Sequence, residues 1–152
     1  MTDYVRKLLP KTRIFMQQIW AYDIGYNRNG FAMESAIQQE GMHERIREYT
    51  LAACQEFNME RVPSGEAWKI ARQSSVVDIL CHRLAVNNGE GDYLHDGDVG
   101  GGQYLNACVW FETITGQSCI GNTWRPENYK LSESMITALQ QAAHRAVAES
   151  RG

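Results

Sequence analysis

Two short apolar segments, set apart by a long helical pattern, limit the fold of this chain more than any other feature. Residues 12–20 (TRIFMQQIW) are rich in Ile, Phe and Trp and follow a proline, which predicts a buried strand. Residues 59–63 (MERVP) predict a second strand, at a sheet edge because Pro63 cannot donate a hydrogen bond to a neighbouring strand. A helix is predicted between them, over residues 36–57. This order predicts an α/β domain with a parallel sheet.

The other helices are predicted from their periodicity and from residues that begin or end helices. We expect helices over residues 2–9 before Pro10, from Ser64 as N-cap to Gln73, over 74–84, along the second half of 92–116 up to Gly116, and from Ser132 as N-cap. Residues 21–35 and 117–130 are predicted loops. The clearest apolar stripe is on the last helix, at Met135, Ile136, Leu139, Ala142, Ala143, Ala146 and Val147.

Two further stripes predict which side chains face the core. On the 36–57 helix they are Ile46, Thr50, Ala53, Cys54 and Phe57, and on the helix before Gly116 they are Tyr104, Leu105, Cys108, Val109 and Ile114. His43 lies among charged residues and is predicted to be on the surface. At least one of Trp110 and Phe111 is expected to be buried against the strand at residues 12–20.

The composition is that of an ordinary globular protein, with 43% apolar and 22% charged residues. A net charge of -3 without a basic run argues against nucleic acid as a partner. No segment is apolar for long enough to span a bilayer, so no membrane association is predicted. The first residues, MTDYVRKLLPKTR, carry charges where an export signal needs apolar residues, so we expect a cytoplasmic location for the chain as given.

The four cysteines do not form a metal-binding pattern. Cys54 and Cys108 lie on apolar helix faces, where cysteine behaves as a small buried hydrophobe. Cys81 and Cys119 complete the set, and none of the spacings is C-x-x-C. We therefore predict no metal site and no cofactor.

Residues 92–116 (DYLHDGDVGGGQYLNACVWFETITG) concentrate ionisable and glycine residues just before a helix. Asp92 and His95 form the pair D-x-x-H, in which a carboxylate can accept the Nδ1–H of the imidazole. That hydrogen bond fixes the tautomer, leaves Nε2 free as a base, and stabilises the imidazolium that forms during acyl transfer. The pair alone fits either two members of a catalytic triad or a solvated loop histidine with a neighbouring carboxylate.

The residues around this pair resemble the C-terminal end of the SGNH (GDSL-type) hydrolases, in an uncharacterised bacterial branch. The resemblance is carried by DYLHDG, G-Q-Y-L and E-T-I-T-G, and by the earlier segments IFMQQIWAYD and VPSGEAWKIAR. It implies a three-layer α/β/α (flavodoxin-like) fold with Asp92 and His95 as catalytic residues. It also implies an ester hydrolase, for instance a carbohydrate O-deacetylase, acting on a small-molecule or carbohydrate ester.

The nucleophile that this resemblance requires is missing from the sequence. SGNH hydrolases carry it in a G-D-S or G-N-S segment, and the chain contains neither. Ser64, in V-P-S-G-E-A, comes closest but fits better as an N-cap. We therefore interpret residues 1–152 as a single SGNH-like domain without its N-terminal, nucleophile-bearing portion, inactive alone. Two strands leave unpaired sheet edges, which favours a homodimer formed through a sheet edge or exchanged elements.

Substrate contacts are expected in the loop that leaves the first strand. In open α/β sheets, ligands bind at the carboxyl ends of parallel strands. Trp20, Tyr22, Asp23 and Asn27 lie there and are the candidates. Aromatic packing around an ordinary loop explains the same residues.

Two functions of other kinds stay open. The first is a non-catalytic interaction or ligand-binding α/β module, in which the acidic loop with Asp92, Asp96 and Asp98 binds a partner or a cation. A calcium loop that starts at Asp92 would need Glu at its twelfth position, where the chain has Gln103. The second is an α/β protein of unrelated function, in which the D-x-x-H pattern is accidental.

Overall fold

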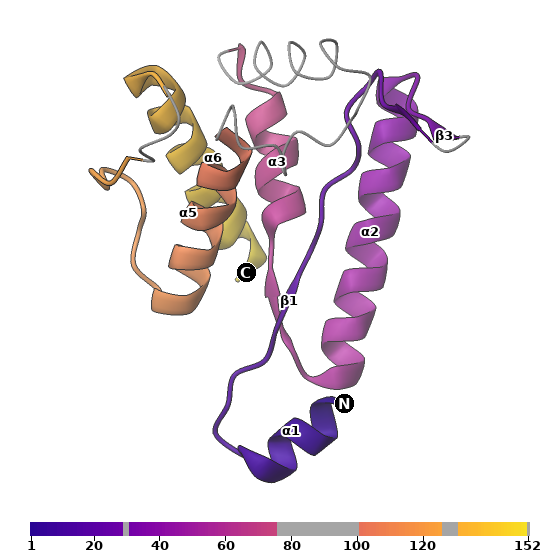
Figure 1. Cartoon of the computed structure of the whole chain (residues 1–152), viewed down its shortest axis with the longest axis vertical. Helices are drawn as coiled ribbons and strands as arrows, with labels where there is room; N and C mark the ends of the chain where they lie inside the picture. Colours follow the sequence, from indigo (N-terminus) through magenta and orange to yellow (C-terminus); the bar gives the residue numbers. More distant parts are fainter. Residues whose placement is uncertain (29–30, 76–100, 126–130, 152) are drawn as a thin grey trace.

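The computed structural model describes residues 1–28, 31–75, 101–125 and 131–151, and of residues 27 and 28 only the backbone (Figure 1). The elements run in the order α1 (Thr2–Leu8), β1 (Phe15–Gln17), β2 (Asn27–Arg28), β3 (Phe31–Ala32), α2 (Ala36–Phe57), β4 (Glu60–Val62), α3 (Ser64–Arg72), α5 (Gly101–Thr115) and α6 (Glu133–Ser150). The predicted helix at residues 74–84 lies almost wholly outside the described residues. The fold is of the mixed α/β kind and mostly helical, which confirms the predicted class.

The two predicted strands pair in parallel, as expected. Phe15 lies opposite Glu60 and Gln17 opposite Val62. β1 has three residues, whereas the predicted strand covered the nine residues 12–20. Beyond it, the backbone N–H of Gln18 still donates to the carbonyl of Val62 at 2.9 Å. The regular pairing ends there because the partner strand β4 ends at Val62, where Pro63 is already the N-cap of α3.

The predicted loop at residues 21–35 contains a second, antiparallel pair of strands. Asn27 lies opposite Ala32 and Arg28 opposite Phe31, so the prediction of a plain loop was wrong. This pair forms a separate sheet, and β2 and β3 lie to the side of the amino end of α2 (Figure 1).

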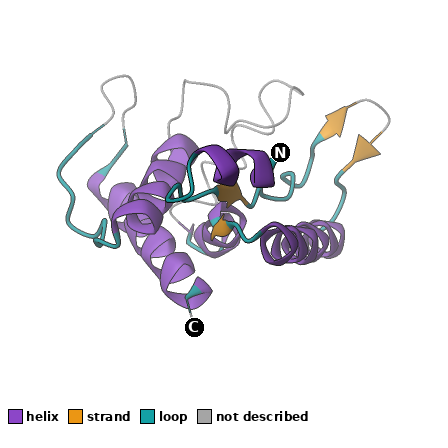
Figure 2. Ribbon diagram, turned by 90° about the horizontal axis from the view of Figure 1, so that it is seen from below, coloured by secondary structure: helices purple, strands orange, loops and turns teal. Residues whose placement is uncertain are grey.

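The parallel strands lie between α2 on one side and the pair α5–α6 on the other (Figures 1 and 2). The core is formed where α3, α5 and α6 meet, and Leu105, Val109 and Leu139 at its centre are at most 1% exposed. Burying such side chains is the main favourable contribution to folding. The described part thus has a small sheet and a helical core, and the full three-layer SGNH fold stays a proposal.

Local sequence signals fixed most helix ends correctly. α2 has the predicted bounds, and α6 follows Ser132, whose hydroxyl accepts from the N–H of Met135. Gly116 ends α5 with φ +73°, a left-handed conformation that glycine adopts at low cost. The predicted cap at Ser64 was wrong, because Pro63 is the N-cap of α3 and Ser64 is its first helical residue.

Three predictions of exposure were wrong. His43 is buried at 4% exposure, because α3 brings an acidic partner against it. Phe57 and Ile114, expected in the core, are 42% and 48% exposed because each lies in the last turn of its helix, past the packing surface. All the predicted α6 stripe is buried except Met135, which is half-buried.

The aromatic end of α5 packs against β1 from the side. Trp110 and Phe111 are both half-buried against the core. The ring of Trp110 meets the ring of Phe15 edge-on, with centroids 5.9 Å apart. The predicted contact with the first strand is thus present, with partial instead of full burial.

Among the described residues, no helix is both long and apolar enough to cross a membrane. The predictions of a cytoplasmic location and of a homodimer stay predictions.

Candidate functional site

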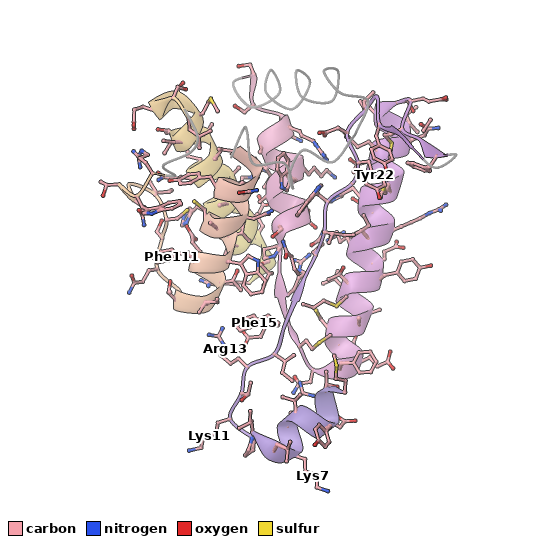
Figure 3. All side chains as sticks on the ribbon, viewed as in Figure 1. Lys7, Lys11, Arg13, Phe15, Tyr22 and Phe111 are labelled. Atoms are coloured by element: carbon pink, nitrogen blue, oxygen red, sulfur yellow. The ribbon has the colours of Figure 1, made fainter. Side chains whose placement is uncertain are left out.

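The predicted catalytic pair, Asp92 and His95, lies outside the described residues. Its position in the chain is bounded by α3 before it and α5 after it. The carboxyl end of α3 and the amino end of α5 both lie at the upper end of the molecule in Figure 1. The chain runs from Phe15 in β1 toward that same end, where Tyr22 lies in the loop after the strand (Figure 3). The carboxyl end of α3 and the amino end of α5 therefore lie at the end of the molecule toward which the parallel strands run. Ligands of α/β proteins bind at that end of a sheet.

Two of the four predicted substrate residues hold the structure together. The ring of Trp20 packs near Trp68, with centroids 6.0 Å apart, at the border of the core. A carboxylate oxygen of Asp23 pairs with Arg72 Nη2 at 2.6 Å. The same nitrogen donates to the carbonyl of Ala21 at 2.7 Å, so Arg72 fixes the loop after β1 onto α3. These contacts support the packing interpretation for Trp20 and Asp23.

Tyr22 differs from these, because it faces a groove. Its ring stacks on Tyr26 with centroids 4.0 Å apart and lies 5.8 Å from Phe31. Its carbonyl accepts from Gln39 Nε2 at 2.7 Å, which fixes the loop to α2. The groove has a volume of about 670 Å³, and we call it the Tyr22 groove; it is lined by Tyr22, Phe31, Gln38, Gly41, Met42, Arg45, Ile46 and Tyr49. Asn27, the fourth candidate, belongs to β2, and only its backbone is described.

A half-buried carboxylate that the sequence analysis missed lies at the start of α3. One oxygen of Glu66 lies 3.2 Å from His43 Nε2, and the other accepts from Gln18 Nε2 at 3.2 Å. Arg61 and Arg47 approach the second oxygen at 3.4 and 3.3 Å. His43, and then Gln18 and Arg61, lower the pKa of Glu66 to about 2 against the opposing effect of burial.

This cluster joins α2, β1, β4 and α3, and its members are mostly closed off from solvent. Gln18 is 0% exposed, as is Ser64, whose hydroxyl accepts from Gln17 Nε2 at 3.2 Å. A hydroxyl without access to solvent cannot attack a substrate, so Ser64 does not suit a nucleophile. The sequence did hold a signal for Glu66, since it is the third residue after the N-cap, where acidic side chains favour helix starts.

A second acid–histidine pair lies between α5 and α6. His144 Nδ1 is 3.1 Å from Glu112 Oε2, and Ser118 Oγ lies 3.4 Å from the same nitrogen. Glu112 is buried at 4% exposure and accepts the backbone N–H of Cys119 at 2.7 Å. Burial alone would raise the pKa of Glu112, but the Cys119 N–H and His144 outweigh it and lower the pKa.

The residues Ser118, His144 and Glu112 are the types of a catalytic triad, but their geometry is different. A triad histidine uses Nδ1 for the acid and Nε2 for the serine. Here both partners contact Nδ1, so Nε2 does not face Ser118 and cannot act as its base while Nδ1 is held by Glu112. The cluster instead holds the segment after Gly116 onto both helices. Its sequence signal was the spacing of Leu105, Val109 and Glu112, which places a carboxylate on the buried stripe of α5.

Within the described ranges, no group of three or more His, Cys, Asp or Glu side chains could hold a metal ion. The prediction of no metal and no cofactor stays a prediction for the whole chain, since residues 76–100 also carry candidate ligands.

Comparisons with known proteins place the chain in a family without assigning it an activity. The structure resembles the crystal structure of a DUF4886 family protein from Bacteroides uniformis ATCC 8492, with a TM-score of 0.74 and 29% sequence identity. The match covers 96% of this chain and 52% of that protein, so the chain spans about half of its relative's length. A search of the curated proteins finds no match. Neither of the two matches links the chain to the SGNH hydrolases. The profile of the family described as "Domain of unknown function (DUF4886)" matches residues 1–146, and the chain therefore belongs to the DUF4886 family.

Proposed function

We propose that this chain is part of an SGNH-type ester hydrolase and that Asp92 and His95 are its catalytic acid and base. The observation that carries the proposal is the D-x-x-H pair followed by the G-x-Y-L helix. That helix corresponds to α5, which begins at Gly101 and buries Tyr104 and Leu105. The position of α5 also supports the proposal, because α5 begins at the end of the molecule toward which β1 runs (Figure 1). Ligands of α/β proteins bind at that end of the sheet.

In this proposal the two residues have separate roles. The Asp92 carboxylate accepts the Nδ1–H of His95 and stabilises the imidazolium, and Nε2 takes the proton of the nucleophile as it attacks the ester carbonyl. Neither Ser64, which is buried, nor Ser118, which contacts the wrong nitrogen of a different histidine, suits the nucleophile. We propose that the serine belongs to a portion that this chain does not contain. The relative's additional length is compatible with this, since the chain covers 52% of it.

The Tyr22 groove supports a carbohydrate or another ring-shaped ester as substrate. Aromatic rings bind the C–H faces of sugars through apolar contact, and the groove offers Tyr22, Phe31 and Tyr49. Tyr49 is 76% exposed and thus available to a ligand. Gln38 and Arg45, which also line the groove, supply donors for hydroxyl or acyl oxygens.

The test compares this chain with its longer relative. With a fluorophosphonate probe and p-nitrophenyl acetate, the chain alone is expected to show no labelling and no turnover above a His95→Ala control. The Bacteroides uniformis protein is expected to be labelled at one serine, and substitution of the residue aligned with His95 should abolish the labelling. No labelling of the relative would contradict the hydrolase proposal. If one serine of this chain is labelled and His95→Ala abolishes the labelling, the expectation that the chain is inactive by itself would be wrong. The hydrolase proposal would still stand.

A binding module without catalysis is the second candidate, and the Tyr22 groove is the observation that favours it. In that case, acetylated and deacetylated oligosaccharides would shift the resonances of Tyr22 and Tyr49 equally, and neither protein would cleave an ester.

A further inference from the structure

Two cysteines meet at a cavity beside α5, apart from the proposed catalytic pair. Cys108 lies on α5 and Cys119 on the segment after it, and they are 6% and 1% exposed. The cavity has a volume of about 320 Å³ and is lined by Tyr104, Ala107, Cys108, Phe111, Cys119, Asn122 and Trp124. Both thiols therefore border one space that is large enough to admit a small molecule.

The contacts of the two thiols differ. Cys108, Cys119 and the Tyr104 ring all line this cavity, so the two thiols face one space. Cys119 Sγ donates to the carbonyl of Gln140 at 3.5 Å. The neighbouring Cys119, with Tyr104, lowers the pKa of Cys108, whereas Cys108 and burial raise the pKa of Cys119. Cys108 is also the more exposed of the two cysteines that line the cavity, and since the thiolate is the reactive form, we take Cys108 as the nucleophile of the pair.

The segment that carries Cys119 is held in place at several points. The backbone N–H of Cys119 donates to Glu112 at 2.7 Å, and the N–H of Gly121 donates to Gln140 Oε1 at 3.0 Å. Gln140 Nε2 donates in turn to the Tyr104 hydroxyl at 2.8 Å. These bonds keep Cys119 beside Cys108 and reduce the entropy that joining the two sulfurs would otherwise cost.

We propose that Cys108 and Cys119 form a redox-active dithiol that a hydroperoxide converts to a disulfide. The Cys108 thiolate attacks one peroxide oxygen, so that an S–O bond forms, the O–O bond breaks, and hydroxide or alkoxide leaves. The Cys119 thiol then attacks the sulfenic sulfur. The S–S bond forms, the S–O bond breaks, and water leaves with the thiol proton. The two sulfurs are oxidised by two electrons in total, and the peroxide is reduced by two.

Cys54 provides an internal control in the same molecule. It is also buried, at 8% exposure, but it lies on α2, and its pKa is raised, chiefly by burial. A buried thiol of this kind is inert. If burial alone determined oxidation, Cys54 and Cys108 would be oxidised to the same extent. If the Cys108–Cys119 pair determines it, Cys108 is oxidised and Cys54 is not.

The experiment uses the whole wild-type chain, treated with equimolar hydrogen peroxide and then mapped by mass spectrometry under non-reducing conditions. We expect the free thiols counted in denaturant to fall from four to two and a single cross-link between Cys108 and Cys119 that dithiothreitol reverses. In a Cys119→Ser variant, a dimedone probe should trap the sulfenic acid at Cys108. In a Cys108→Ser variant, Cys119 should stay unmodified.

Either of two results would overturn the proposal. One is that all four thiols remain free after peroxide treatment while diamide also fails to join Cys108 to Cys119. The other is that dimedone labels Cys54 as readily as Cys108, or that the first disulfide to form contains Cys54. Because the thiol count and the disulfide mapping use the unsubstituted chain, their results cannot be attributed to a variant that fails to fold.

Discussion

Replacement of Gly65 by alanine is expected to destabilise the protein by about 3 kcal/mol, at the upper end for an added methyl group in a packed site. The N–H of Gly65 donates to the carbonyl of Gln18 at 2.9 Å, where α3 begins against the extension of β1. A Cβ atom at Gly65 would lie closer to the carbonyl oxygen of Ile19 than real Cβ atoms come, and 2.9 Å from Gln18 Nε2. Because the first obstacle is backbone, a side-chain rotation cannot relieve it.

Urea unfolding of Gly65→Ala measures this effect, and Gly41→Ala is the matched control. A Cβ atom at Gly41, within α2, would meet no atom within 4 Å. This substitution should therefore stabilise the protein by about 0.5–1 kcal/mol through helix propensity. An unfolding midpoint of Gly65→Ala equal to that of the wild type would show that α3 does not begin against β1.

Glu66→Gln is expected to destabilise the protein by about 3 kcal/mol at neutral pH. The folded-state pKa of Glu66 is about 2, below its ordinary value of 4.5, and the side chain is only 21% exposed. A depressed folded-state pKa means that the ionised carboxylate stabilises the fold. This contribution is complete above pH 4.5 and is lost as the pH falls from there through about 2.

The measurement is the difference in unfolding free energy between wild type and Glu66→Gln at a series of pH values. The difference should be about 3 kcal/mol at pH 7 and should shrink toward zero near pH 2. Glu56→Gln, on an exposed position of α2, should show a difference near zero throughout. A difference for Glu66→Gln that does not change with pH would contradict the assigned pKa.

The helices were predictable because their signals are local. Each helix end is determined by residues close to it in the sequence. Examples are the bounds of α2, the glycine that ends α5 at Gly116, and the N-cap of α6 at Ser132. The β2–β3 pair was predictable too, since Asn29-Gly30 is a strong hairpin signal, but the polar residues around it were interpreted as a loop.

The polar clusters could not be predicted because their partners are distant in sequence. His43 has charged neighbours on its own helix, which indicated a surface, whereas its partner Glu66 comes from α3. Glu112 and His144 lie on two helices that only the packing of α5 on α6 brings together. Local spacing can show that Glu112 faces inward, but it cannot show which side chain meets it there.

The central claim is that Asp92 and His95 act as one pair, and an NMR titration of the histidine rings tests it most directly. A carboxylate hydrogen-bonded to Nδ1 stabilises the imidazolium, so Asp92→Asn should lower the pKa of His95 by about one unit. Asp96→Asn, a change in the same acidic loop that removes the same charge, should lower it much less. The ring nitrogens of His95 in the wild type should also report a single tautomer with the proton on Nδ1. Equal pKa values of His95 in the wild type, Asp92→Asn and Asp96→Asn proteins, with both tautomers populated, would contradict the pair.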